Sequence, residues 1–437
     1  MQQPSSQLTR RHFLTSTALA AGAAAVGTAV GPFVAPTLAD KPKLVYWAYQ
    51  FLRASDESRV NFAKEWGEKN NVDMQITLVP WKEFMTKISA AIQAKATPDI
   101  VESGGVELRA MGQLLEVTDL YEKLDKEHGG WLGAGPLYMR AADGKVHHLL
   151  YGLTGFMIVA RNDLLKQANV KLPMDTWEDL LAAAKKAQQI PRIYGLGHPV
   201  SNQTDSNVWE QVMKSYGARL ADEAGKKIVL GDFKKEVWTF MDFFMNVWKS
   251  DVLPPGVTTW DNTMNNSTYQ AGKSVFALNP ITISLWLEAN NPELLAKTGH
   301  YPFPKGPARY IWDANYASRS ILKYTKYPDV AKQFLLDSMD IKKMEAELGV
   351  SQWAPVLNSY LKFDVWNRND HMKSLVEVAA KGNPEGYPDV FNDPWREQYT
   401  NTTISRMLQR LVVDNWDRDK AFAETLEVLN KIYAKYA

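Results

Sequence analysis

The sequence has 437 residues, with 50 lysines and arginines against 49 aspartates and glutamates, so its formal charge at pH 7 is only +1. A chain with so little net charge and no basic run lacks the electrostatic signature of a nucleic-acid-binding protein. Cysteine is absent from the sequence, which excludes disulfides, iron–sulfur clusters, thiolate zinc sites, covalently attached haem and a cysteine nucleophile.

The first 39 residues differ in composition from the rest. Residues 9–14 (TRRHFL) place two adjacent arginines before an apolar stretch rich in alanine and glycine. This order is typical of a twin-arginine export signal, and residues 37–39 (TLA) resemble a cleavage site, so we expect the mature chain to begin at Asp40. The alternative is a membrane anchor, but Pro32 and Pro36 interrupt the stretch before it reaches the roughly 20 apolar residues that span a bilayer. With no cysteine to carry a lipid, the protein is expected to be free in the periplasm.

The first part of the mature chain alternates between strand and helix patterns. Residues 43–49 are apolar and aromatic and predict a strand, after which Ser55 and the acids that follow it predict the cap of a helix. Residues 73–79 alternate with the period of a strand, and residues 81–92 carry one apolar stripe at helical spacing. Residues 98–101 then predict a third, short strand.

Such alternation is typical of a mostly parallel sheet covered by helices, which binds ligands in the crevice beyond the carboxyl ends of its strands. The loops after the first and third strands are therefore candidates for ligand contact. They consist of Tyr49, Gln50 and Phe51, and of Glu102, Ser103 and Gly104. Two roles stay open for Glu102, which is able to bind the hydroxyl or cationic groups of a ligand or to be a solvated or salt-bridged loop acid.

Two segments are candidate crossings between lobes, because nearly 400 mature residues exceed one ordinary domain. Residues 143–145 (DGK) are a hairpin signal, and residues 151–160 after them are extended and uncharged. Residues 302–307 (PFPKGP) form a proline- and glycine-rich break that suits a second crossing. The expected division is residues 40–153 and 303–340 for the first lobe, and residues 154–302 and 341–437 for the second.

The second lobe is predicted to contain a capped helix, a further ligand loop and a closing helix. Residues 176–179 (TWED) form a capping box before an amphipathic helix. A strand over residues 273–278 stops at Asn279, because the proline that follows it ends ladder pairing and exposes a loop. Apolar side chains at Phe422, Leu426, Leu429 and Tyr433 predict the closing helix.

Catalytic motifs are missing from the sequence. His147 and His148 are adjacent, which points them to opposite faces of a strand, and no histidine pair has the spacing of a zinc helix. No nucleophile elbow, phosphate-binding loop or dinucleotide fingerprint is present. Acidic pairs such as Asp261 with Glu288 are the residue type that glycosidases use, but a sequence does not show their separation. We therefore expect a binding protein without a cofactor or metal, rather than an enzyme.

Six short elements stand in order along the mature chain, and together they resemble carbohydrate-type (family 1) extracellular solute-binding proteins of ABC importers, which include the maltose-binding protein. They are residues 44–47 (LVYW), 97–101 (TPDIV), 143–146 (DGKV), 269–276 (YQAGKSVF), 303–307 (FPKGP) and 329–335 (DVAKQFL). The fourth departs from the family pattern by a tyrosine in place of phenylalanine.

The resemblance implies a bilobed α/β fold of the periplasmic-binding-protein type, joined by crossover segments, that closes on a ligand by hinge motion. It implies a monomer that delivers a small sugar or sugar derivative to an inner-membrane permease. By this resemblance the ligand contacts would be Tyr49, Gln50, Phe51, Glu102, Ser103, Gly104, Asn279, Trp312 and Asn315, with Trp209 and Trp353 as further candidates. Aromatic faces suit the C–H face of a sugar, and amides and carboxylates suit its hydroxyls.

Other ligands and functions stay open. An anionic ligand, such as a sugar acid or a sulfonated sugar, needs an arginine partner, for which Arg53 and Arg319 are available in the sequence, whereas a polyamine needs convergent carboxylates. A polyol is a neutral option. A periplasmic carbohydrate-active enzyme and a ligand sensor that docks to a membrane receptor are the alternatives from other functional classes.

Overall fold

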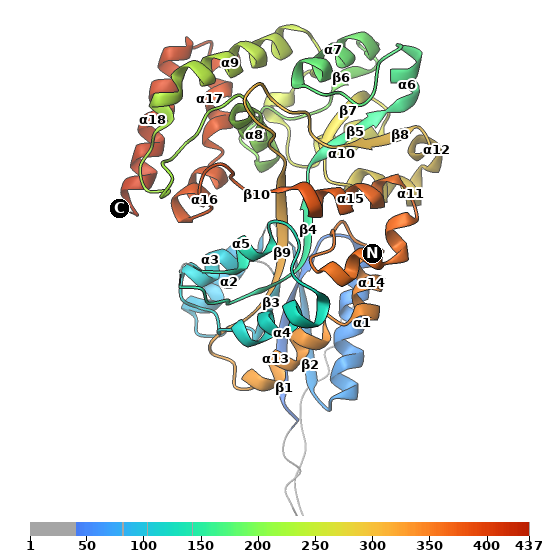
Figure 1. The fold of residues 1–437 in the computed structure, drawn as a ribbon, viewed down its shortest axis with the longest axis vertical. Coiled ribbons are helices and arrows are strands. Elements are labelled where there is room, and N and C mark those ends of the chain that lie inside the picture. Colours follow the sequence, from blue (N-terminus) through green and yellow to red (C-terminus); the bar gives the residue numbers. More distant parts are fainter. Residues whose placement is uncertain (1–40, 81–82, 103, 142, 437) are drawn as a thin grey trace, which may run out of the picture. The chain divides into compact units, whose positions relative to one another are not determined.

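Two β-sheets with helices packed around them organise the part of the chain that the structure describes (Figure 1). This computed structural model describes residues 41–80, 83–102, 104–141 and 143–436. The expected signal peptide and its cleavage site before Asp40 lie outside the described residues, as do Trp81 and Ser103. No helix among the described residues is both long and apolar enough to cross a membrane.

The first sheet has six strands in the order β10-β9-β3-β1-β2, with β4 paired to β9. Its strands are β1 (Lys43–Gln50), β2 (Asp73–Pro80), β3 (Ile100–Glu102), β4 (Leu149–Gly155), β9 (Asp313–Ile321) and β10 (Asn383–Pro384). β1 runs parallel to both β2 and β3, and β10 runs parallel to β9, whereas β9 is antiparallel to β3 and β4.

The second sheet has four strands in the order β6-β7-β5-β8. They are β5 (Met157–Arg161), β6 (Tyr194–Leu196), β7 (Ser274–Asn279) and β8 (Thr298–Tyr301). Only β6 and β7 pair in parallel, and β5 is antiparallel to β7 and β8. The expectation of a mostly parallel sheet is therefore right for β1 to β3. Beyond them the sheets are mixed, because β9 returns from the four-stranded sheet and runs antiparallel to β3 and β4.

The helices divide between the two sheets. On the side of the six-stranded sheet lie α1 (Arg53–Lys69), α2 (Phe84–Gln93), α3 (Gly105–Ala110), α4 (Thr118–His128), α5 (Gly135–Met139), α13 (Pro328–Asp337) and α14 (Ile341–Leu348). On the other side lie α6 (Asn162–Gln167), α7 (Trp177–Ala187), α8 (Val208–Ser215), α9 (Lys234–Lys249), α10 (Met264–Gln270), α11 (Thr282–Asn290) and α12 (Pro292–Leu295). The chain ends with α15 (Asp370–Lys381), α16 (Asp393–Thr400), α17 (Thr403–Val412) and α18 (Arg418–Ala434).

Both expected crossings are present. Only Phe156 separates β4 in the six-stranded sheet from β5 in the four-stranded sheet. Residues 302–312 then lead from β8 back to β9. The exact lobe boundaries stay a prediction, and the packing of α14 against α1 favours placing residues 341–348 with the six-stranded sheet.

Local signals explain where several helices begin. At Thr176 the hydroxyl accepts from the Asp179 backbone N–H and the Asp179 carboxylate accepts from Thr176 N–H, so the expected capping box is confirmed. The expected cap at Ser55 is wrong, because α1 already begins at Arg53 and Ser55 lies within its first turn. The Asp56 carboxylate, in the same first turn, accepts a hydrogen bond from the Phe51 N–H at 3.1 Å.

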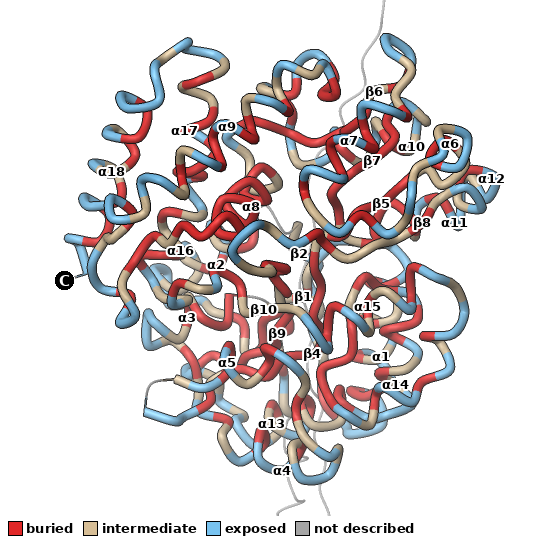
Figure 2. Tube along the Cα trace, turned by 45° about the horizontal axis from the view of Figure 1, so that its top comes forward, coloured by how far each residue is buried: buried red, intermediate tan, exposed pale blue. Residues whose placement is uncertain are grey.

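Burial follows the sheets and the helix faces that cover them, as Figure 2 shows. Every residue of β4 and of β7 is buried, which agrees with their nearly continuous apolar sequences. The helix α8 is buried along its whole length, including an ion pair of 2.7 Å between Lys214 and Glu210. The closing helix α18 buries Phe422, Leu429 and Tyr433 as expected.

Candidate ligand-binding site

The loops after β1 and β3 lie next to each other. The two strands are parallel neighbours with Trp47 opposite Val101, so their carboxyl ends meet at the same edge of the sheet. The Tyr49 backbone N–H donates to the Glu102 carboxylate at 3.0 Å, which joins the two strand ends directly. Tyr49, Gln50 and Glu102 were predicted in loops, but they are the last residues of β1 and β3. The two candidate segments therefore meet at one end of the sheet, and ligand contact by their residues stays a prediction.

Side chains at this edge differ in their exposure. Gln50 is exposed and Phe51 is 44% exposed, so both present surface to solvent. Tyr49 is half-buried and its ring packs against Phe84 at a centroid distance of 5.1 Å. Gly104 is buried at the N-cap of α3 with a φ of 68°, in the left-handed region where a side chain is strained.

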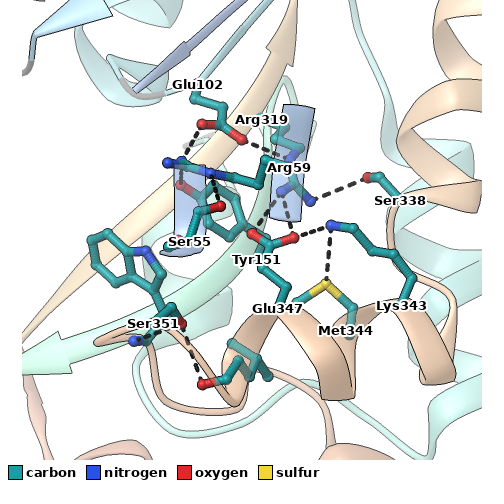
Figure 3. Close-up of polar contacts among 12 residues, drawn as sticks. Ser55, Arg59, Glu102, Tyr151, Arg319, Ser338, Lys343, Met344, Glu347 and Ser351 are labelled. Atoms are coloured by element: carbon teal, nitrogen blue, oxygen red, sulfur yellow. Dashed lines mark hydrogen bonds and ion pairs between the residues drawn. The ribbon is translucent and has the colours of Figure 1, made fainter. Parts of the chain in front are cut away.

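Six charged side chains lie directly behind these segments, and we refer to them as the ionic clamp. Figure 3 shows all of them except Asp56. They are Asp56, Arg59, Glu102, Arg319, Lys343 and Glu347. Each side chain is at most 9% exposed, and three acids face three bases. Buried charges are stable only when they are paired and hydrogen-bonded, and these six side chains pair with one another.

Glu102 is the centre of the ionic clamp. Its Oε2 accepts from Arg59 Nη1 at 2.5 Å as well as from the Tyr49 N–H, and its Oε1 accepts from Arg319 Nε at 3.1 Å and from the Tyr46 hydroxyl. Burial and the negative charge of Glu102 raise the pKa of Tyr46 well above its usual value, which keeps this hydroxyl a donor. Of the two roles that the sequence leaves open for Glu102, the structure shows the salt-bridged one, and contact with a ligand stays a prediction.

Arg319 joins Glu102 to the helix α14. It donates from Nη2 to both oxygens of Glu347, at 2.9 and 3.1 Å, and from Nη1 to Ser338 at 3.2 Å, while its guanidinium lies 4.1 Å from the centre of the Tyr151 ring. Burial opposes the ionised form of Glu347, but the charges of Arg319 and Lys343 outweigh it and lower the pKa of Glu347 to about 2. Glu347 is therefore charged throughout the neutral range.

Neither arginine that the sequence offers to an anionic ligand is unpaired. Arg319 is taken up by the ionic clamp, and Arg53, whose side chain is 91% exposed, pairs with Glu57 at 2.8 Å. In the described part of the chain, both candidate arginines therefore already have carboxylate partners.

A second polar group, which we call the amide clamp, holds the loop after β7 in the four-stranded sheet. It consists of Asp205, Asn262, Asn265, Asn279 and Thr282. Asn265 is fully buried and donates from Nδ2 to Asp205 at 3.0 Å and to Asn279 Oδ1 at 3.1 Å. Asn279, only 2% exposed, donates to the Thr282 hydroxyl at 2.7 Å.

The first crossing brings the candidate asparagines of the two sheets toward each other. Thr154 on β4 is opposite Asn315 on β9, and Met157 on β5 is opposite Asn279 on β7. Because Thr154 and Met157 are three residues apart along one extended segment, their partners are separated by roughly 10 Å along the chain direction. Asn315 is half-buried, so part of its amide is accessible.

The three candidate tryptophans differ in environment. Trp209 lies on α8 rather than near a loop, is 2% exposed, and donates from its indole to the Pro199 carbonyl at 2.9 Å. Trp312 precedes β9, is 1% exposed, and its indole donates to the Phe156 carbonyl at the first crossing. Trp353 is only half-buried and its ring meets Tyr151 edge-on at 6.0 Å. Of the three, Trp353 therefore presents the most surface, and ligand contact by any of them stays a prediction.

An aromatic cluster that sequence reasoning missed lies beside the start of β9. Its rings belong to Tyr138, Tyr316, Phe391, Trp395 and Tyr399, and neighbouring ring centres are 4.5 to 5.3 Å apart. The sequence signal was residues 391–399 (FNDPWREQY), which combine three aromatic rings with a helix start. A single sequence does not show that α5 and β9 bring two further tyrosines to the same place.

An ion pair borders this aromatic cluster and connects helices from the two parts of the fold. Arg396 on α16 pairs with Glu107 on α3 at 2.9 Å and with Glu385 at 3.2 Å. The second oxygen of Glu107 is buried and has no hydrogen-bond partner among the described residues. Because α3 directly follows the loop at Glu102, the pair places α16 close to the first candidate loops.

Acidic and histidine groups and surface hollows are the other features that bear on a functional site. No group of histidine, aspartate and glutamate side chains among the described residues is arranged to hold a metal ion. His148 is fully buried, and burial lowers its pKa to about 3. Two surface hollows, of about 690 and 390 Å³, are lined by residues such as Trp248 and Arg406 and contain none of the candidate residues.

Comparison with known families gives two matches. Residues 52–335 match the model of the bacterial extracellular solute-binding proteins. Residues 1–36 match the model of the twin-arginine signal of the iron–sulfur subunit of ubiquinol–cytochrome c reductase. The second match concerns the signal segment alone and agrees with the twin-arginine pattern at residues 9–14.

Solved structures of similar fold cover nearly the whole chain. MalE3 of T. maritima with bound maltose has a TM-score of 0.76 at 18% identity, over 89% of this chain and 98% of that chain. A solute-binding protein of Thermotoga lettingae bound with α-D-tagatose has a TM-score of 0.76 at 15% identity, over 90% and 100%. The GacH receptor of Streptomyces glaucescens, known unliganded and with acarbose, has a TM-score of 0.73 at 18% identity, over 91% and 100%.

These structures confirm the expected fold class, a bilobed α/β fold of the periplasmic-binding-protein type. Because the sequence identities are below 20%, these three structures show the fold of this chain and not its ligand. The family model, in contrast, covers well over half of the chain and includes both candidate crossings. On this match, the protein belongs to the bacterial extracellular solute-binding proteins.

Proposed function

We propose that this protein is the periplasmic solute-binding component of an ABC importer, and that it captures a small neutral sugar between the loops of its two sheets and delivers it to a membrane permease. The observation that carries the proposal is that the first crossing joins the strand paired with Asn315 in one sheet to the strand paired with Asn279 in the other, in a chain of this family. The twin-arginine match supports export. The relatives of similar fold that were solved with maltose and α-D-tagatose support a sugar as the ligand.

The chemistry at the two edges favours a neutral ligand. The charged groups of the ionic clamp are paired with one another, and Glu107 is paired with Arg396. Among the described residues, the buried oxygens without a hydrogen-bond partner include the Thr154 hydroxyl and the Gln352 amide oxygen. They also include one carboxylate oxygen each of Glu107 and Asp313, whose other oxygens are paired with Arg396 and with the Gly386 N–H. Hydroxyls, amides and aromatic faces are the groups that recognise sugars.

The test is a thermal-shift panel on the mature protein with maltose, laminaribiose, tagatose, a sugar acid and spermidine. A neutral sugar is expected to raise the melting temperature in proportion to the logarithm of its concentration, because binding at 100 times Kd adds about 2.7 kcal/mol to the free energy of unfolding. Mass spectrometry should recover that sugar unchanged. A response to spermidine or the sugar acid alone, or turnover of the sugar, would contradict the proposal.

A matched pair of variants locates the site. Phe51→Ala removes an aromatic ring that is 44% exposed at the edge where β1 and β3 end. Tyr324→Ala removes one that is 58% exposed just beyond β9, at the opposite edge, because β9 runs antiparallel to β3. We expect at least a tenfold weaker affinity for the bound sugar in Phe51→Ala, from a lost stacking face, and no change in Tyr324→Ala. Equal affinities would remove Phe51 from the site.

A further inference from the structure

We propose that the ionic clamp is the positioning device of the binding site: Arg59 and Glu102 fix the backbone of residues 49–51, and Arg319 and Glu347 connect that segment to the one that carries Trp353. Those side chains would act through the loops rather than by touching the ligand. The role in ligand binding rests on the proposed function, whereas the fixing of the loops does not.

The clamp holds the backbone of the first loop at three points. Arg59 Nη2 donates to the Tyr49 carbonyl at 2.7 Å, and Glu102 accepts from the Tyr49 N–H. Both backbone polar groups of Tyr49 are therefore hydrogen-bonded to the ionic clamp. Asp56, which is ion-paired with Arg59, accepts from the Phe51 N–H at 3.1 and 3.2 Å. The exposed side chains of Gln50 and Phe51 thus extend from a backbone fixed on both sides.

The same clamp reaches the segment of Trp353 by two routes. Glu347 belongs to the last turn of α14, and residues 349–353 follow it directly, with the Trp353 N–H donating to Ser351 at 3.2 Å. Tyr151 provides the second route, because its hydroxyl accepts from Arg59 at 3.3 Å and its ring contacts both the Arg319 guanidinium and the Trp353 indole. Gly152 lets the indole approach, since a Cβ there would lie 2.4 Å from Trp353 Cβ.

A stabilising role alone does not explain why six charges are buried here. Replacing a buried ion-pair group by well-packed apolar residues is often neutral or stabilising, so such a group is poor support for a purely energetic role. Apolar side chains do not hydrogen-bond backbone groups, so they are unable to hold one carbonyl and two N–H groups of residues 49–51 at fixed positions. The bonds from the clamp to Tyr49 and Phe51 are of that kind.

The experiment is hydrogen–deuterium exchange of the mature protein without ligand. Glu102→Gln keeps the shape of the side chain and removes its charge, and we expect the amides of residues 49–51 to exchange at least tenfold faster, with the segment at residues 351–354 following. Peptides from the amide clamp, such as residues 274–282, should be unchanged. The matched control is Glu424→Gln, which breaks a bidentate pair with Arg410 at 2.7 Å far from these loops in the sequence and should leave residues 49–51 unchanged.

Two outcomes would overturn the inference. Unchanged exchange at residues 49–51 in a folded Glu102→Gln protein would show that the loop is fixed by other means. Faster exchange spread evenly over the six-stranded sheet would show a general loss of stability instead of a local release. If Glu102→Gln fails to fold, Asp56→Asn gives the same reading at the Phe51 amide, because Asp56 lies at the edge of the clamp.

A second readout links the device to ligand binding. For the sugar that gives the largest thermal shift, we expect Glu102→Gln to bind at least tenfold more weakly. Arg59→Lys, which keeps the charge but has one nitrogen for the five partners of Arg59, should be intermediate. Tight binding by both variants would contradict a positioning role. A panel in which no sugar binds would overturn the proposed function alone, because the exchange experiment uses no ligand.

Discussion

The two sheets hold their candidate loops by different chemistry. Behind the loops of β1 and β3, three acids and three bases are buried together as the ionic clamp. Behind the loop of β7, the amide clamp has one carboxylate, that of Asp205, among amides and a hydroxyl. Removing one partner of a buried charge pair costs about 3–5 kcal/mol, against about 1–3 kcal/mol for one buried neutral partner. The loss of one partner is therefore expected to cost more in the ionic clamp than in the amide clamp.

The largest effect is expected for Arg319→Met, which leaves Glu102 and Glu347 facing each other without the guanidinium between them. We expect the free energy of unfolding to fall by about 3–5 kcal/mol, because two buried carboxylates lose their shared partner. Denaturant titration measures it. Arg53→Met is the control, because its pair with Glu57 is exposed to solvent and its loss should leave the stability nearly unchanged. Equal losses of unfolding free energy in the two variants would mean that the buried ion pairs of the ionic clamp contribute no more than an exposed pair.

Acid should act on the ionic clamp through Glu347. Its pKa of about 2 in the folded protein lies below its ordinary value of 4.5, so its contribution is complete above pH 4.5 and is lost as the pH falls through about 2. By linkage this contribution is about 3 kcal/mol. The stability difference between the native protein and Glu347→Gln should therefore shrink as the pH falls below 4.5.

Buried histidines do not obscure that comparison. Burial lowers the pKa of His148, His198 and His300 to about 3 each, so acid also destabilises the protein as the pH falls below their ordinary value of 6.5. Both proteins share this loss, and it cancels in the difference. A difference that stays constant down to pH 2.5 would show that Glu347 is not held by its charge.

A smaller effect is expected in the amide clamp. Asn265→Ala removes a fully buried amide and leaves Asn279 Oδ1 without its donor, so the free energy of unfolding should fall by about 1–3 kcal/mol. Asn290→Ala, on the exposed end of α11, is the control and should change it by less than about 0.5 kcal/mol. A loss for Asn265→Ala as large as that for Arg319→Met would remove the distinction between the two clamps.

Local sequence signals predicted most of the fold. The capping box at Thr176, the end of β7 at Asn279 and the crossing at residues 151–160 depend on neighbours in sequence, and the structure has all three. The cap at Ser55 failed because the sequence pattern did not show that the helix begins two residues earlier.

The site was harder to predict because its contacts are remote in sequence. Glu102 is ion-paired to a residue 217 positions away, so a sequence does not distinguish its ion-paired role from ligand contact. Trp312 and Trp353 both lie near loops, yet one indole is enclosed at the crossing and the other is half-buried. The pairing of Arg396 with Glu107 has no sequence signal for the same reason.

The proposed function requires that one ligand contacts residues from both sheets at the same time. Hydrogen exchange with and without the sugar that gives the largest thermal shift tests it most directly. If one ligand contacts both sheets, saturating sugar slows exchange in residues 49–56 and in residues 279–286 at the same time. Exchange stays unchanged at the two surface hollows lined by Trp248 and Arg406. Protection confined to one sheet, or located at either surface hollow, would contradict it.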